Sequence, residues 1–274
     1  MSLASPRHQR AHGRAELHVA QTPRGPELRH LFQAAPLRIL FPRPEPGEWP
    51  QPALVNVGGG LAGGDRLEMV ARIEAGAAAT LTTPAAEKLY RSLGEPSRID
   101  TELHLEDGAT LEWLPRETIL FDGARLQRRM RAHLAPGARL LAAEMLVFGR
   151  AARDEAMTQG SLLDSWRLWR GGRLHWADAT AFDDPATALA RPFGFGGAGA
   201  SALLLLAGSE AEARAARDIL REQGHAATLA RPGLMLARWT GAATPVREAL
   251  CAALPALRAG VLGRPPRLPR LWTT

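Results

Sequence analysis

The chain has 274 residues, of which 46% are hydrophobic and 23% are charged, and its formal net charge is +6. This composition is typical of a globular protein and excludes a wholly disordered or fibrous chain. The single cysteine, Cys251, excludes an intramolecular disulfide and a cysteine-rich zinc module. The first residues lack the apolar segment of a signal peptide, and the longest apolar run is too short to cross a bilayer. We therefore expect a cytoplasmic protein with no membrane contact.

The positive charge comes almost entirely from arginine, because only one of the 34 basic residues, Lys88, is a lysine. Arginine binds phosphates and carboxylates well, so an anionic partner is one interpretation. The abundance of alanine, glycine and proline favours the other, a GC-rich genome. The arginines are scattered and no aromatic platform accompanies them, so we expect no binding to nucleic acid. The densest run is expected on the solvated face of a strand: Arg125, Arg128, Arg129 and Arg131.

The composition changes along the chain. Residues 1–13 have little apolar content, and we expect them to form a mobile tail. We expect one domain over residues 14–274, with a β body at about 14–195 and a small α+β region at about 198–260. The dense prolines of residues 36–52 exclude a long helix near the start of the β body.

The middle of the chain carries a repeat. Gly-Ala pairs occur at residues 76–77, 108–109 and 137–138, at spacings of 32 and 29 residues. Apolar and polar residues alternate before each pair, which is typical of strands with one buried face, and glycine suits the turn that follows. The pattern predicts three successive β-hairpins over residues 65–148 and another at Gly171-Gly172. The expected fold is mainly β, a superhelical or layered stack of antiparallel β-hairpins with a small C-terminal α+β region.

In the last region of the chain, the spacing of the apolar residues changes. Residues 201–207 read as a buried strand, and Ser209 can cap a helix over 210–223. A hairpin is expected over 226–240. A second helix is expected to open at Thr244 and Pro245 and to run to about Arg258, with Gly260 after it.

A glycine-rich loop stands out at Gly58–Gly64, where the spacing satisfies the dinucleotide-binding fingerprint. That fingerprint requires a helix directly after the loop, whereas residues 67–73 alternate with period two and predict a strand. We therefore favour a crossing where backbone segments approach closely. A nucleotide-dependent enzyme that uses this loop is kept as the alternative.

Several carboxylates lie in apolar surroundings: Glu112, Glu117, Asp122, Glu144 and Glu155. A buried carboxylate is costly unless it is paired or binds a cation. One interpretation is salt bridges to nearby arginines, namely Arg116, Arg125, Arg150 and Arg153. The other is a hydrophilic path for a cation, with ligands weak enough to release it.

The sequence offers little for catalysis. It contains no Gly-x-Ser-x-Gly elbow, and Cys251 lies among alanines and leucines, as expected of an inert buried thiol. The body of the chain has no closely spaced pair of histidines, so a tight zinc or nickel site is not expected. We expect no catalytic residues, no stably bound cofactor and no enzyme activity.

The sequence resembles the urease accessory protein UreD family, also called UreH, from about residue 14 to the last residue. The resemblance is carried by ordered motifs: residues 56–67 (NVGGGLAGGDRL), 82–92 (TTPAAxKxYRS), 111–122 (LEWLPRETIxFD), 148–155 (FGRxxRxE) and the closing 269–274 (PRLWTT). Two positions depart from the family pattern. Asp154 stands where glycine is usual, which puts the local turn geometry in question, and Ala35 stands where glycine is common before Pro36.

The resemblance implies a non-enzymatic chaperone with a superhelical β fold. Members of the family bind UreF, through it the GTPase UreG, and the urease apoprotein, and the resemblance leaves room for a dimer of such complexes. Nickel would then be in transit, and not a resident cofactor. Carboxylates within the family-like motifs are the expected ligands of a transient nickel path: Asp65, Glu117, Asp122, Glu144 and Glu155.

Overall fold

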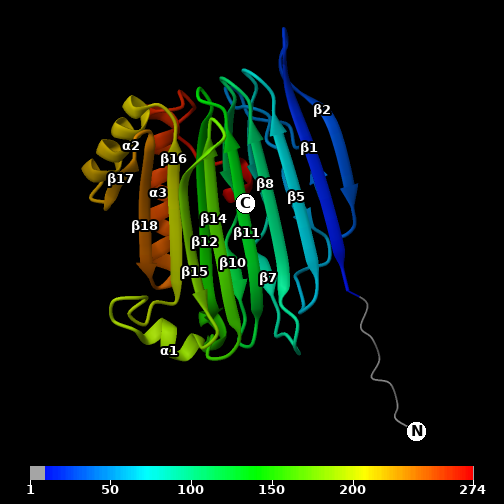
Figure 1. Ribbon diagram of the computed structural model, residues 1–274, viewed down its shortest axis with the longest axis vertical. Coiled ribbons are helices and arrows are strands. Elements are labelled where there is room, and N and C mark those ends of the chain that lie inside the picture. The colour runs from blue at the N-terminus through cyan, green and yellow to red at the C-terminus, as the bar shows by residue number, and fades with distance from the viewer. Residues whose placement is uncertain (1–9, 274) are drawn as a thin grey trace.

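The computed structural model describes residues 10–273, which form two large β-sheets and a helical layer (Figure 1). The first sheet has seven strands, in the spatial order β15 (Arg173–Phe182), β14 (Ser161–Arg170), β11 (Arg125–Leu134), β8 (Ser97–Leu105), β5 (Arg66–Ile73), β1 (His12–Thr22) and β2 (Gly25–Ala34). Within the described residues, no helix is both long enough and apolar enough to cross a membrane.

The second sheet faces the first. Its main path is β17 (Ala227–Arg231), β18 (Leu234–Gly241), β16 (Ala200–Ala207), β12 (Arg139–Arg150), β9 (Thr110–Leu114), β6 (Ala78–Thr82), β4 (Ala53–Asn56) and β3 (Leu37–Leu40). Three short strands adjoin this path: β7 (Glu87–Leu89), β10 (Thr118–Leu120) and β13 (Glu155–Ala156). The helices are α1 (Pro185–Ala190), α2 (Glu210–Glu222), α3 (Ala243–Gly260) and two 3₁₀ turns, Ala151–Arg153 and Arg270–Trp272.

Successive strands of the repeat lie in different sheets. β5 runs through the first sheet, the chain turns at Gly76, and β6 continues in the second sheet. β8 and β9, and then β11 and β12, repeat this course, so that each repeat is one coil of a solenoid. β5, β8 and β11 pair in parallel, as do β6, β9 and β12. Gly76 and Gly108 turn the chain with φ of 69°, a conformation that glycine adopts readily.

The mainly β, stacked architecture is confirmed, whereas the antiparallel pairing expected within residues 65–148 is wrong. Alternation shows that one face of a strand is buried, but it does not identify the neighbouring strand. Each turn here carries the chain to the facing sheet, so the two strands of a coil share a core and hydrogen-bond to other coils. An antiparallel hairpin does form around Gly171-Gly172, between β14 and β15.

The two sheets differ in how they are covered. The larger apolar core lies between them and includes Leu17, Leu103 and Leu140. A second core lies between the second sheet and helices α2 and α3, and includes Leu204 and Leu250. The second sheet is therefore apolar on both faces where the helices pack, and β12 is buried along nearly its whole length. The first sheet has a solvated outer face, and β11 alternates between buried and exposed positions.

The C-terminal elements follow the sequence closely. A capping box at Ser209 and Glu212 opens α2, and β17 and β18 form the expected hairpin. Helix α3 begins at Ala243, slightly before the predicted start, and α1 was not predicted. The tail expected over residues 1–13 falls outside the described residues for 1–9, while His12 and Gly13 belong to β1.

The glycine-rich loop is a close crossing of backbone segments, as the sequence favoured. It is followed by the strand β5, and not by a helix. A Cβ atom placed on Gly63 would lie 2.0 Å from Ser92 Oγ and 2.5 Å from Glu95 O, and one on Gly60 would lie 2.8 Å from Lys88 O. These glycines are needed because the neighbouring segment leaves no room for a side chain.

Replacing Gly63 by alanine is expected to destabilise the protein by about 1–3 kcal/mol, because the added methyl group overlaps with Ser92 and Glu95. Gly94→Ala is the matched control: a Cβ on Gly94 meets nothing within 4 Å, and its stability should change by less than about 1 kcal/mol. Thermal melting of both variants measures the difference. Equal melting temperatures would contradict the close crossing.

Candidate functional site

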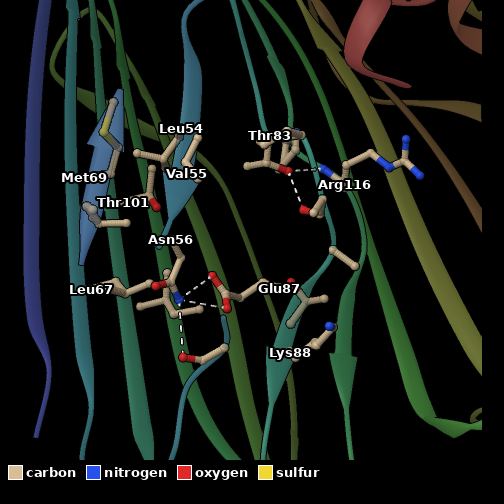
Figure 2. A pocket seen from close by; sticks show the side chains of 18 of the residues that line it. Leu54, Val55, Asn56, Leu67, Met69, Thr83, Glu87, Lys88, Thr101 and Arg116 are labelled. Atoms are coloured by element: carbon tan, nitrogen blue, oxygen red, sulfur yellow. Dashed lines mark hydrogen bonds between the residues drawn. The ribbon is translucent and has the colours of Figure 1, made fainter. Parts of the chain in front are cut away.

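A cavity of about 230 Å³ lies between the two sheets, and three of the sequence motifs meet at it (Figure 2). The motif residues that line it include Asn56, Gly59 and Gly60 from the first motif, Thr83, Glu87 and Lys88 from the second, and Trp113 and Arg116 from the third. Apolar side chains of the first sheet, such as Leu67 and Met69 of β5, complete the wall. The motifs are thus distant in sequence and adjacent in space.

The closing motif holds this region together from outside the cavity. Trp272 Nε1 donates hydrogen bonds to Leu114 O at 3.0 Å and to Thr82 Oγ1 at 3.1 Å. Arg116 Nη1 donates to the carbonyl oxygens of Leu271 and Trp272, at 3.2 and 3.0 Å. The end of the described chain is thereby fixed to the strands β6 and β9 and the loop after β9.

Glu87 is a half-buried carboxylate of the cavity wall. Its two oxygens accept hydrogen bonds from Asn56 Nδ2 at 3.0 and 3.2 Å, and Figure 2 shows the two side chains pointing toward one another from β7 and β4. Burial raises the pKa of Glu87 to about 7, although the hydrogen bond from Asn56 opposes the rise. Glu87 therefore changes its charge near neutral pH, and a cation that enters the cavity would favour its ionised form.

The raised pKa of Glu87 predicts a pH-dependent stability. The folded state holds the proton up to about pH 7, whereas the unfolded chain releases it near 4.5, so stability falls as pH rises through this window. Glu87→Gln keeps the shape without the charge and should remove this loss, which is roughly 2–3 kcal/mol by pH 8. Melting temperatures at pH 5.5 and pH 8 measure the effect. If the melting temperatures of the wild type and of Glu87→Gln changed equally between these two pH values, the raised pKa of Glu87 would be contradicted.

Glu144 of β12 lines the same cavity and is almost fully buried. Its carboxylate accepts hydrogen bonds from Trp166 Nε1 at 2.8 Å and Trp113 Nε1 at 3.3 Å, and Arg128 Nη2 lies 3.3 Å away. Burial raises the pKa of Glu144, and the charge of Arg128 limits the rise. Arg128 also binds both carboxylate oxygens of Asp164, at 2.8 and 2.7 Å. The result is a buried cluster of one arginine and two carboxylates.

A second, smaller cavity of about 40 Å³ is also lined by Arg128 and Glu144. Its other walls include Asp164, Asp178 and Arg238, and Arg238 Nη2 lies 2.6 Å from Asp178 Oδ2. The Arg128–Glu144 pair therefore lines both cavities.

Two of the other predicted carboxylates have structural partners away from both cavities. Asp65 accepts hydrogen bonds from the backbone N–H groups of Ala11 at 2.8 Å and Ala62 at 2.7 Å, which tie the start of β1 to the glycine-rich loop. Glu117 lies 3.2 Å from Arg247 Nη1 of α3 and 3.7 Å from Arg116 Nε.

The remaining two, Asp122 and Glu155, line an open pocket of about 630 Å³. Burial acts to raise the pKa of Asp122, but hydrogen bonds from Thr158 and Gln159 outweigh it and hold the pKa below its usual range. Arg150 binds Glu155 through two hydrogen bonds and lowers its pKa. Asp154 beside it has a left-handed φ of 52°, so the turn keeps the conformation that glycine favours.

Of the five predicted carboxylates, only Glu144 lines the cavity between the sheets. Asp122 and Glu155 are neighbours, since Asp122 N donates to Glu155 Oε1 at 3.2 Å. Asp65 and Glu117 have other partners and contact none of the predicted carboxylates in the part of the chain that the structure describes. Across residues 10–273, no three of the five bring ligand atoms close enough together to hold an ion jointly.

Sequence reasoning missed two residues of the site. Glu87 lies inside a recognised motif, but no local signal marks it as buried, because its burial comes from segments on other coils. Arg128 was expected in solvent and is instead buried. The alternation could have found it, since Arg128 belongs to the same inward series as Leu126 and Met130.

Comparison with known proteins supports the motif resemblance. The sequence model of the family described as UreD urease accessory protein matches residues 11–273. A urease accessory protein UreD of Granulibacter bethesdensis is 50% identical over 240 residues, which cover 85% of this chain and 99% of that protein. Relatives of the same name from Methylobacterium sp. strain 4-46 and Azorhizobium caulinodans are 44% and 42% identical, and each match covers 98% of this chain and 97% or 98% of the relative. The chain belongs to the UreD family of urease accessory proteins.

Proposed function

We propose that this protein is a non-enzymatic scaffold in urease maturation, which joins the urease apoprotein to UreF and, through UreF, to UreG. In this role it supports delivery of nickel to the urease active site and works in the cytoplasm, where urease is assembled. Membership of the urease accessory family supports the general role.

The observation that carries the proposal is the meeting of the family-like motifs at one cavity between the sheets. The cavity wall combines residues of three motifs with two carboxylates, the half-buried Glu87 of the second motif and the buried Glu144 of β12. Carboxylate oxygens bind a divalent cation weakly enough to release it. A route for nickel through the interior would use these two groups.

The other four predicted carboxylates would support the route from outside the cavity. Asp122 and Glu155 line an open pocket in which Arg91 and Arg150 neutralise them, so they suit an entry or contact surface better than a tight ion site. Asp65 and Glu117 would act by fixing the loop and helix that border the route.

The alternative, a nucleotide-dependent enzyme that uses the Gly58–Gly64 loop, is disfavoured because a strand follows the loop. No helix N-terminus is positioned there to bind a pyrophosphate. Titration of the protein with ATP, GTP and NAD distinguishes the two functions, since micromolar binding of any of them would favour the enzyme.

Gene deletion tests the scaffold directly. Deleting this gene from a urease-positive host is expected to leave urease expressed but without nickel, and supplying the full chain should restore both nickel and activity. The measurements are the nickel content per urease active site and the co-purification of UreF and urease with the chain. Fully nickel-loaded urease in the deletion strain would overturn the proposal.

A further inference from the structure

A cluster of metal-ligating side chains lies on the outer face of the first sheet, away from the cavity between the sheets. It consists of Glu16 and His18 on β1 and His30 on β2, whose ligand atoms all lie within 4.8 Å of one another. Glu16 Oε2 is 3.3 Å from His30 Nε2, and the two imidazole centroids are 4.6 Å apart. Two atoms bound to one ion at 2.0–2.1 Å lie about 3.0–3.4 Å apart, so small side-chain rotations would complete the geometry.

Strand pairing creates this cluster from residues that are separated in sequence. Leu17 and Val19 point into the core, so the alternation directs Glu16 and His18 outward. His30 is the direct antiparallel partner of His18, and a β-bulge follows immediately in the register. Spacing in the sequence does not predict this site, because its third member, His30, comes from the returning strand.

The charges around the cluster affect how strongly it can bind a cation. Burial, His30 and Arg72 all lower the pKa of His18, which favours the neutral imidazole that binds a metal. Arg14 Nη2 contacts one oxygen of Glu16, Oε1, at 2.7 Å, and leaves the other turned toward His30. Glu74 adds a negative charge near His18. Arg14 and Arg72 oppose a bound cation, so the site is one of moderate affinity.

A second cluster of the same composition lies on the same sheet face and differs in geometry. Glu102 and His104 of β8 lie beside His133 of β11, with Glu102 Oε1 at 2.8 and 3.8 Å from the two imidazole Nε2 atoms. These two rings are stacked at an interplanar angle of 9°, and His133 stacks in turn on Trp169 at 7°. Lone pairs of stacked parallel rings lie in separate planes and do not converge on one ion. The rings of His18 and His30 are inclined at 45°, so their planes intersect.

We propose that Glu16, His18 and His30 form a binding site for a divalent first-row transition cation, such as Ni²⁺ or Zn²⁺. Two imidazoles and one carboxylate suit these ions, whereas Ca²⁺ and Mg²⁺ prefer sites made of oxygen atoms. The remaining coordination positions face solvent. A bound ion links β1 to the edge strand β2, and it does so independently of urease or of any route through the interior.

The test is a titration of the untagged full-length chain with Ni²⁺ against a chromophoric chelator at pH 7.5. If UreF is needed for solubility, every variant is measured as the same complex. The double variant His18→Ala/His30→Ala should weaken binding by at least about tenfold. Glu16→Gln should weaken it less, and Arg14→Gln should strengthen it because a competing charge is removed. The matched control, His104→Ala/His133→Ala, removes two histidines from the same sheet face and should leave binding unchanged.

A melting experiment separates loss of ligands from loss of fold. Added Ni²⁺ should raise the melting temperature of the wild type and of the control, but not of the His18→Ala/His30→Ala variant. The His18→Ala/His30→Ala variant could have a lowered melting temperature without metal. In that case the test rests on Glu16→Gln and Arg14→Gln, which should shift the affinity for Ni²⁺ in opposite directions. Binding that is equal in both double variants, or a wild type that binds neither Ni²⁺ nor Zn²⁺, would overturn the site.

Discussion

Replacing Arg258 by methionine is expected to destabilise the protein by about 3–5 kcal/mol, which would lower the melting temperature by about 10 °C. The side chains of Arg258 of α3 and Glu112 of β9 have no exposed surface, and that of Glu48 is 2% exposed. Arg258 Nε donates to Glu112 Oε1 at 2.7 Å, and Nη2 contacts Glu48. Methionine would fill the space but would leave Glu112 buried without a positive partner, while Glu48 would keep only Arg267, whose Nε lies 2.9 Å from Oε1.

Two further variants distinguish charge from packing. Arg214→Gln breaks an exposed pair with Glu210 on α2 and should change stability by less than about 1 kcal/mol. The double variant Arg258→Met/Glu112→Gln also removes the charge that Arg258→Met leaves unpaired and should recover part of the lost stability. If Arg258→Met melts like Arg214→Gln, the buried cluster does not stabilise the fold.

Neutralising the two carboxylates of the cavity, Glu87→Gln/Glu144→Gln, is expected to lower nickel incorporation into urease several-fold. The complex with UreF should form in normal yield. Glutamine keeps one acceptor oxygen at each position, enough for Asn56 and for the shorter hydrogen bond from Trp166, but supplies no charge for a cation. Arg128 remains paired with Asp164, so the fold should survive. Nickel per urease active site and pull-down yield are measured on the same preparations.

The comparison variant is Asp122→Asn/Glu155→Gln, which neutralises the same number of carboxyl groups in the open pocket at the C-terminal ends of β10 and β12. A drop in nickel with this comparison variant alone would place the route on the surface. Normal nickel loading by the soluble cavity variant would exclude Glu87 and Glu144 from it. Joint loss of complex and nickel would mean that these carboxylates serve the fold.

The sequence predicted the strands of the repeat better than their pairing. The alternation around Ile99 and Leu103 depends only on which face is buried, and that is a local property. Whether the turn at Gly108 returns the chain beside β8 or carries it to the facing sheet depends on contacts with other coils. Helix α2 was predictable throughout, because its capping box and its polar and apolar faces lie within one segment.

The sequence could predict that buried carboxylates form salt bridges, but not which residues most of them pair with. Salt bridges were one expected fate of the buried carboxylates, and Glu155 does pair with the nearby Arg150. Glu112 pairs with Arg258, 146 residues away in sequence, and this contact exists only once α3 has packed on the second sheet. Long-range partners of this kind leave no periodic signal, whereas the burial of Arg128 was visible in its strand register.

Parallel stacking sets the length of the molecule in steps of one strand. Neighbouring strands of a sheet lie about 4.8 Å apart, and β5, β8, β11 and β14 each add one such step between the β1–β2 end and the helical end. Inserting or deleting one coil would change the separation of the two ends by that increment, while the remaining coils kept their hydrogen bonds. Proteins bound at opposite ends would therefore be held at distances that vary discretely with coil number, and relatives could adjust this spacing without redesigning either binding surface.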